Sequence, residues 1–140
     1  MSDRHISQIA ALESECFSEP WSEEGLTSEL TNTQARFFVC EEENEVLGYM
    51  GMHIILDECY IANVAVYPQH RRRGIGEMLV KHCTAIAEKE NCCFITLEVR
   101  KSNLKAIALY EKNGFITVGE RKDFYSRPKE NGLIMTKELR

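Results

Sequence analysis

Apolar residues spaced three and four positions apart mark the helical segments of this chain. One such series lies near the N-terminus, at Ile6, Ile9, Leu12, Cys16 and Phe17. Another follows residue 74, at Ile75, Met78, Leu79, Cys83 and Ile86. This spacing places the apolar side chains on one face of a helix. Together with capping residues, it predicts helices over residues 3–17, 22–30, 74–90 and 103–113, with Asp3, Ser22 and either Ser102 or Asn103 as caps.

Runs rich in β-branched and aromatic residues alternate with these helices and predict strands. We expect six strands, over residues 36–41, 46–55, 57–66, 93–99, 115–120 and 133–138. A helix separates the third strand from the fourth, so these two should run parallel. The last two should be antiparallel, joined by a long polar loop that contains Tyr125 and Pro128. Gly48 and Gly51 lie inside the second strand, where glycine indicates a bulge or close packing.

The segment Val64–Gly76, with the sequence VAVYPQHRRRGIG, joins the third strand to the long helix. Pro68 ends strand pairing, while Gly74 and Gly76 let the backbone turn tightly and approach a ligand. Several N–H groups at the helix start then lie beside three arginines, an arrangement typical of a phosphate or pyrophosphate site. The pattern is neither a Walker loop nor GxGxxG. An ordinary connection with a solvated basic loop fits the spacing equally well.

Composition narrows the class of protein. A chain of 140 residues with 44% hydrophobic and 28% charged residues is expected to form one domain, over residues 1–140. The net charge of −5 argues against nucleic acid as the main partner and favours a basic peptide. No apolar run reaches membrane-spanning length and no secretory signal pattern is present, so we expect a cytoplasmic protein without a membrane partner.

The cysteines and histidines give no sign of a metal site or a disulfide framework. The six cysteines form no C-x-x-C pair, and most lie in apolar periodic segments, where a free thiol acts as a small buried hydrophobe. The four histidines show no metal-ligand spacing. We therefore expect no metal and no native disulfide.

Three stretches of sequence resemble a known family. Arg71-x-x-Gly74-x-Gly76 resembles the acyl-CoA pyrophosphate loop of the GNAT superfamily of N-acetyltransferases, with a strand before it and a helix after it. A second block resembles, more narrowly, the ribosomal-protein-alanine acetyltransferases of the RimI type. It comprises Leu97–Arg100, Ser102–Asn103, Ala106–Tyr110 and Gly114–Phe115. The stretch Phe17–Ser22 resembles the N-terminal motif of the same subfamily, so the resemblance covers nearly the whole chain.

The resemblance implies the GNAT fold, an α/β (α+β) architecture. Its mixed, strongly twisted sheet carries helices on both faces, and two parallel strands splay apart to admit coenzyme A. Related enzymes usually begin with a strand before the first helix, whereas almost no chain precedes residue 3 here. We therefore expect that first strand to be short or missing.

The resemblance also implies acetyl-CoA as co-substrate. A strand bulge would expose a backbone N–H within Val64, Ala65 and Val66 to hold the thioester carbonyl. The remaining residues expected to bind coenzyme A are Arg71, Arg72, Arg73, Gly74, Ile75, Gly76, Glu77 and Asn103. For Asn103, a helix-capping role is compatible with this contact.

Acetyl transfer from a thioester to an amine requires two proton movements. The ammonium must lose a proton before it attacks, and the leaving thiolate should receive one. Glu98, near a strand end, suits the first as a general base, directly or through water; Tyr110 suits the second as an acid. Both match RimI-type positions. Their ordinary alternatives are a Glu98 that is solvated or paired with a nearby arginine such as Arg100, and a Tyr110 that packs in the core.

The acceptor side is less well defined by sequence. Trp21 and Tyr125 resemble substrate-binding residues of this family, although Trp21 is equally expected to be a core residue packed between helices. Glu130-Asn131-Gly132 departs from the Glu-Asp-Ala expected near there.

The implied reaction is direct acetylation of the N-terminal alanine of a small-subunit ribosomal protein, without an acyl-cysteine. The alternatives are a GNAT enzyme for other N-termini, lysines or small amines, a non-catalytic coenzyme A sensor, and an RNA-binding module that uses Arg71–Arg73. The sequence does not predict the oligomeric state.

Overall fold

The computed structural model describes residues 1–71 and 73–140. Its helices are α1 (Ile6–Cys16), α2 (Glu23–Glu29), α3 (Ile75–Lys89) and α4 (Leu104–Lys112), with short 3₁₀ turns η1 (Asp3–His5) and η2 (Pro68–His70). Its strands are β1 (Ala35–Glu42), β2 (Glu45–Ile55), β3 (Glu58–Val66), β4 (Phe94–Arg100), β5 (Ile116–Ser126) and β6 (Lys129–Glu138). Every helix and strand predicted from the sequence is present.

Helix caps account for two of the helix starts. The Ser22 hydroxyl accepts a hydrogen bond from the Gly25 N–H at 3.0 Å, and the Asn103 side chain accepts one from the Ala106 N–H at 3.2 Å. Each bond satisfies a donor that the first turn of a helix leaves without a partner. The prediction for Asp3 is wrong: Asp3 lies inside η1, and Ser2 precedes this turn as its cap residue.

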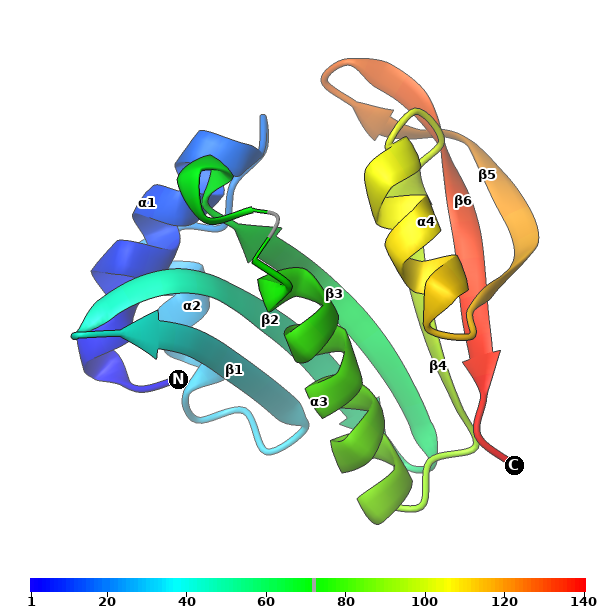
Figure 1. The fold of residues 1–140 in the computed structure, drawn as a ribbon, viewed down its shortest axis with the longest axis horizontal. Helices are drawn as coiled ribbons and strands as arrows, with labels where there is room; N and C mark the ends of the chain where they lie inside the picture. The colour runs from blue at the N-terminus through cyan, green and yellow to red at the C-terminus, as the bar shows by residue number, and fades with distance from the viewer. Residues whose placement is uncertain (72) are drawn as a thin grey trace.

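The sheet has the order β1-β2-β3-β4-β6-β5, and all neighbouring strands are antiparallel except β3 and β4. The parallel pair is short. Glu58–Tyr60 of β3 pair with Phe94–Thr96 of β4, and beyond Tyr60 the two strands separate. Figure 1 shows the resulting V-shaped opening between β3 and β4. The predicted splay is therefore confirmed, and within the described residues no strand precedes α1, as expected.

Helices cover both faces of the sheet and divide the core in two (Figure 1). On one face, α3 and α4 pack on β2, β3 and β4 around residues such as Leu79, Ile95 and Phe115. On the other, α1 and α2 cover β1–β3 around Leu12 and Tyr49. Among the described residues, no helix covers the face of β4, β6 and β5 behind α4, and Glu98 is exposed on its strand.

The predicted loop over residues 121–132 is wrong. β5 continues to Ser126 and β6 begins at Lys129, so only a tight turn at Arg127–Pro128 separates them. β5 is the edge strand and is exposed along most of its length, so it lacks the apolar alternation by which a strand is recognised. Tyr125 consequently lies on a strand, paired with Glu130, rather than in a loop.

Gly48 is a position in β2 where backbone approaches backbone closely. A Cβ atom there would lie 2.9 Å from the Ala65 carbonyl oxygen and 3.2 Å from Ile75 Cγ2. We expect Gly48→Ala to lower the free energy of unfolding by about 1–3 kcal/mol, because the neighbouring strand must move to admit the methyl group. Urea unfolding measures this. Gly119→Ala is the control, since its Cβ would meet only Ile134 Cδ1 at 3.4 Å, an ordinary contact; equal losses in both variants would contradict the prediction.

Candidate active site

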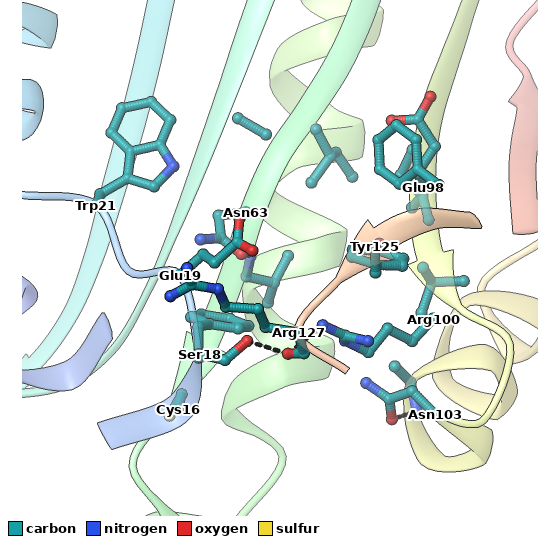
Figure 2. Close-up of a pocket in the computed structure, with 18 of the residues that line it drawn as sticks. Cys16, Ser18, Glu19, Trp21, Asn63, Glu98, Arg100, Asn103, Tyr125 and Arg127 are labelled. Carbon is teal, nitrogen blue, oxygen red and sulfur yellow. Dashed lines mark hydrogen bonds between the residues drawn. The ribbon is translucent and has the colours of Figure 1, made fainter. Parts of the chain in front are cut away.

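A cavity of about 700 Å³ lies in the opening between β3 and β4. Its wall combines the α1–α2 segment, β3, β4, α4 and the β5–β6 turn. Figure 2 shows Trp21 and Glu19 on one side of it, and Glu98, Arg100 and Asn103 on the other. The predicted site residues in the wall are Trp21, Val64, Glu98, Asn103, Tyr110 and Tyr125. Residues far apart in the sequence are thus brought together by the separation of two strands.

The exposed edge of β3 carries the backbone groups of this site. The Tyr67 N–H donates to the Leu47 carbonyl at 3.0 Å, and Ala65 lies opposite Tyr49 in the same ladder. Successive residues of a strand point their polar groups to opposite edges. The Ala65 N–H therefore faces β2, and the N–H groups of Val64 and Val66 face the side from which β4 has separated. Val64 N–H already contacts Asn63 Oδ1 at 3.2 Å, so the Val66 N–H is the better placed donor.

A bulge in β3 lies earlier than expected. The register against β2 shifts between the pairs Gly51–Asn63 and Met52–Ile61, which places the extra residue at Ala62. Two residues there oppose one on the partner strand, and this bends the bulged strand. The bend lies close to the end of pairing to β4 at Tyr60.

Arg71 and residues 73–76 lie beside this edge but outside the cavity wall. Gly74 occupies the cap position of α3 with φ of 76°, a left-handed conformation that suits glycine. Because Gly74 has no side chain, the N–H groups of the first turn, which include those of Gly76 and Glu77, are not capped from that position. Arg71 donates from Nε to the Val66 carbonyl at 3.1 Å. Arg72, also predicted to bind phosphate, lies outside the described residues.

Two charged side chains near the start of α3, those of Arg73 and Glu77, form ion pairs within the protein. Arg73 pairs with Glu42 at 3.0 Å. Glu77 accepts from Lys112 at 3.0 Å and lies 3.2 Å from Lys81, and these hydrogen bonds hold the pKa of the Glu77 carboxyl below its usual value. The Glu77 side chain is therefore anionic, and only its backbone N–H suits a phosphate.

Glu98 is accessible at the cavity wall. Its side chain is 34% exposed, and Oε1 lies 3.1 Å from Nε of Arg121 on β5. Arg100, the neighbour considered from the sequence, instead pairs with Glu130 at 3.2 Å. Because Glu98 and Arg121 are both solvent-accessible, their ion pair is weak and leaves the carboxylate available to a proton donor in the cavity.

Tyr110 is nearly buried on α4, at 7% exposure, and its ring packs against Phe115 with 5.6 Å between centroids. It is thus a core residue and a cavity-wall residue at once. Burial, followed by the proximity of Tyr125, raises the pKa of Tyr110 above its usual value of 10. The hydroxyl therefore keeps its proton throughout the neutral range.

Tyr125 is held in the wall by Arg100. The guanidinium carbon of Arg100 lies 4.3 Å from the centre of the Tyr125 ring. The same guanidinium donates to the carbonyls of Pro128 at 2.8 Å and Arg127 at 3.0 Å. Arg100 therefore ties the β5–β6 turn to β4 and fixes the position of Tyr125 by a cation–π contact.

The α1–α2 segment meets this turn across the cavity. The Ser18 hydroxyl donates to the Arg127 carbonyl, as Figure 2 shows, and the Ser126 hydroxyl donates to Glu19 at 2.5 Å. Trp21 lines the same side while its ring packs 5.7 Å from that of Phe37. The two roles considered for Trp21 are thus compatible, because one face of the residue is in the core and another borders the cavity.

The comparison with known families settles the class of protein. Residues 6–115 match the family described as the acetyltransferase (GNAT) family. The chain belongs to the GNAT family. It is therefore an acyltransferase, and the predicted resemblance and fold are confirmed.

Individual GNAT relatives agree with this assignment. The ribosomal protein bS18-alanine N-acetyltransferase of Escherichia coli (strain K12) is 34% identical over 120 residues, covering 83% of this chain and 79% of the relative. The crystal structure of the ribosomal-protein-S18-alanine N-acetyltransferase from Escherichia coli has a TM-score of 0.91 at 28% identity, covering 99% of this chain and 90% of that one. The PaiA N-acetyltransferase from Thermoplasma acidophilum, in complex with coenzyme A, shares the fold with a TM-score of 0.80 at 19% identity, covering 99% of this chain and 96% of that one.

Sequence reasoning missed Glu13 and Asn63 at this GNAT site, and it missed that Arg100 holds Tyr125 and the β5–β6 turn. Glu13 is fully buried beneath the cavity, and Asn63 and Arg100 line it. Glu13 and Asn63 both interrupt the pattern of apolar residues in the sequence. Glu13 follows Ile9 by four positions and so falls on the apolar face of its helix, and Asn63 interrupts the apolar run IANVAV. Polar residues at core positions are retained where they are hydrogen-bonded.

Residues 1–71 and 73–140 contain neither a cluster of metal-ligating side chains nor a membrane-spanning helix. No group of three or more His, Cys, Asp and Glu side chains there is placed to hold a metal ion. No helix in that part of the chain combines the length and the apolar character needed to cross a bilayer.

Proposed function

We propose that this GNAT enzyme transfers an acetyl group from acetyl-CoA to the N-terminal alanine of a small-subunit ribosomal protein in the cytoplasm. The observation that carries the proposal is the cavity between β3 and β4, which contains Glu98, Tyr110 and the open edge of β3. The bS18-alanine acetyltransferase relative supports the choice of acceptor. Three tasks follow for the residues of this chain: holding the thioester, deprotonating the amine and protonating the leaving thiolate.

Acetyl-CoA would lie along the open edge of β3. Its pyrophosphate fits the start of α3, where the uncapped N–H groups at Ile75, Gly76 and Glu77 and the positive end of the helix dipole favour an anion. Arg71, Arg73 and Asn103 would contact the phosphates and the arm of the cofactor. The Val66 N–H would donate to the thioester carbonyl, and such a fixed donor stabilises a developing oxyanion by about 3 kcal/mol.

Glu98 would accept the proton of the incoming ammonium, directly or through one water molecule. Its carboxylate is on the accessible face of β4 and borders the cavity, where an acceptor can reach it. A carboxylate in this position also attracts the cationic N-terminus before the proton is lost. Glu19, across the cavity, adds a second negative charge on the acceptor side and favours a basic peptide.

Tyr110 would donate its proton to the departing thiolate. Its raised pKa keeps the hydroxyl protonated at neutral pH, so that a proton is available to the thiolate of coenzyme A as the C–S bond breaks.

The amine attacks directly, so no acyl-cysteine is needed. Cys16 is the cysteine in the cavity wall, and its thiol faces Arg71 and the Val66 carbonyl. Burial raises the pKa of this thiol, which makes Cys16 a poor nucleophile.

A peptide panel tests the proposed acceptor. Short peptides that differ only in their first residue would be mixed with acetyl-CoA, and coenzyme A release followed. A peptide with a blocked N-terminus and an internal lysine would be the control. We expect turnover on Ala-starting peptides and none on the blocked peptide. Turnover on the lysine would overturn the N-terminal specificity, and coenzyme A binding without any turnover would favour the sensor instead.

A further inference from the structure

A buried carboxylate lies directly beneath the acceptor side of the cavity. The Glu13 side chain is fully buried and receives three hydrogen bonds. The Trp21 N–H donates to Oε1 at 2.9 Å, and the Tyr49 hydroxyl and Asn63 Nδ2 donate to Oε2 at 2.7 and 2.6 Å. These three donors come from the α1–α2 segment, β2 and β3. Glu13 therefore joins three segments at one point.

The Trp21 N–H, the Tyr49 hydroxyl and the Asn63 NH₂ group all donate to the two oxygens of Glu13. Burial raises the pKa of the Glu13 carboxyl, and these three hydrogen bonds act in the opposite direction by stabilising the ionised form. No cation is among these three partners, so the charge is stabilised by hydrogen bonds. A buried charge held in this way is costly compared with an apolar core residue. Stability of the fold by itself does not explain why a carboxylate occupies this position.

The carboxylate determines which way the Asn63 amide points. Asn63 presents its NH₂ group to Oε2 of Glu13, and its Oδ1 then faces the opposite side. That oxygen accepts from the Val64 N–H at 3.2 Å. Asn63 lies next to the bulge at Ala62, and its side chain borders the cavity. The orientation of Asn63 thus sets the polar groups that β3 offers to an acceptor.

The same carboxylate also holds the opposite wall. Its bond to the Trp21 N–H fixes the backbone just before α2, where the Trp21 side chain enters the cavity wall. Trp21 and Asn63 belong to segments that are distant in sequence, and Glu13 is a shared hydrogen-bond partner of both.

We propose that Glu13 is a positioning residue for the acceptor: it holds Trp21 and the Asn63 amide in the arrangement that binds the N-terminus to be acetylated. The inference rests on the proposed function. Glu13 would act through Asn63 and Trp21, because its own side chain is fully buried and does not touch the substrate. The start of α3, where acetyl-CoA phosphates would bind, is not part of this network.

The experiment compares Glu13→Gln with Tyr49→Phe. In Glu13→Gln, the introduced NH₂ group faces the NH₂ of Asn63, so the Asn63 amide must turn over. Tyr49→Phe removes a hydrogen bond from the same carboxylate but leaves the Trp21 and Asn63 contacts in place, and Tyr49 is not in the cavity wall. We expect Glu13→Gln to lower kcat/KM for the peptide about tenfold or more and Tyr49→Phe to change it less than about twofold. Thermal unfolding of both variants shows whether they are matched in stability.

A compensating pair makes the test independent of folding losses. Asn63→Asp alone places two carboxylates against each other and should lower kcat/KM further than Glu13→Gln. In the double variant, which combines Glu13→Gln with Asn63→Asp, the amide introduced at position 13 can donate to the carboxylate introduced at position 63. That carboxylate still accepts from the Val64 N–H. We expect the double variant to recover to within about threefold of wild type, since interacting residues are non-additive.

Calorimetric binding of acetyl-CoA should be unchanged in all four variants. Absence of turnover by the wild-type enzyme on every peptide means that the proposed function has failed. With an active wild type, equal kinetics for Glu13→Gln and Tyr49→Phe, or no recovery in the double variant, would overturn the role of Glu13 alone.

Discussion

Glu98→Gln should lower kcat by about 10²–10⁴-fold, the range that general base catalysis contributes. Glutamine keeps the size and hydrogen-bonding reach of the side chain but cannot accept the proton of the ammonium. Glu98 is partly exposed and makes one ion pair, so the fold should tolerate the change. Steady-state kinetics with an Ala-starting peptide measures kcat, and calorimetry measures acetyl-CoA binding, which we expect to stay at the wild-type level.

Arg121→Gln is the matched control for this prediction. It removes the ion-pair partner of Glu98 on β5 but leaves the carboxylate in place. Because the pair is solvent-accessible, its loss should change kcat less than about threefold. A Glu98→Gln enzyme as active as Arg121→Gln would show that another group, or bulk water, removes the proton. Raising the pH provides a second check, since a larger deprotonated fraction of the acceptor amine should partly restore the Glu98→Gln rate.

The sequence was sufficient for the parts of the fold with a strong local signal. The amphipathic pattern of α3 and the alternation along β4 placed both elements correctly, and the helix between β3 and β4 gave the parallel pair. The length of the edge strand β5 was underestimated because most of its residues are exposed and do not alternate between apolar and polar. Strand pairing there depends on hydrogen bonds to β6, which the sequence pattern does not report.

The candidate site shows a similar division. Glu98, Tyr110 and the loop that ends at Gly76 could be proposed from the sequence because they belong to contiguous motifs. The partners of these residues are set by strand register and turn geometry: Arg121 reaches Glu98 because β5 and β4 both pair with β6. Arg100, expected near Glu98, instead holds the β5–β6 turn. Buried contacts such as that of Glu13 with Asn63 join residues 50 positions apart, and no local pattern connects them.

Tyr110→Phe should lower kcat by about 10²-fold or more while leaving peptide and acetyl-CoA binding nearly unchanged, as the loss of a general acid predicts. The substitution removes only the hydroxyl, and the ring keeps its packing against Phe115. Without a proton donor, the thiolate must leave as an anion. The raised pKa of Tyr110 means that the wild-type hydroxyl is available at all neutral pH values, so the deficit should be constant between about pH 6 and about pH 9.

The leaving group offers the sharpest check on this role. A thioester of a more acidic thiol needs less protonation as it departs, so the deficit of Tyr110→Phe should shrink with such a donor if that donor still binds. Tyr60→Phe is the control, because Tyr60 is not part of this cavity wall and hydrogen-bonds Glu58. A merely structural Tyr110 would show the same deficit with every donor, together with a lower unfolding temperature. If the deficit instead becomes smaller as the leaving thiol becomes more acidic, the hydroxyl acts on the departing sulfur. Deprotonation of the amine and binding of the thioester carbonyl then remain with Glu98 and the β3 edge.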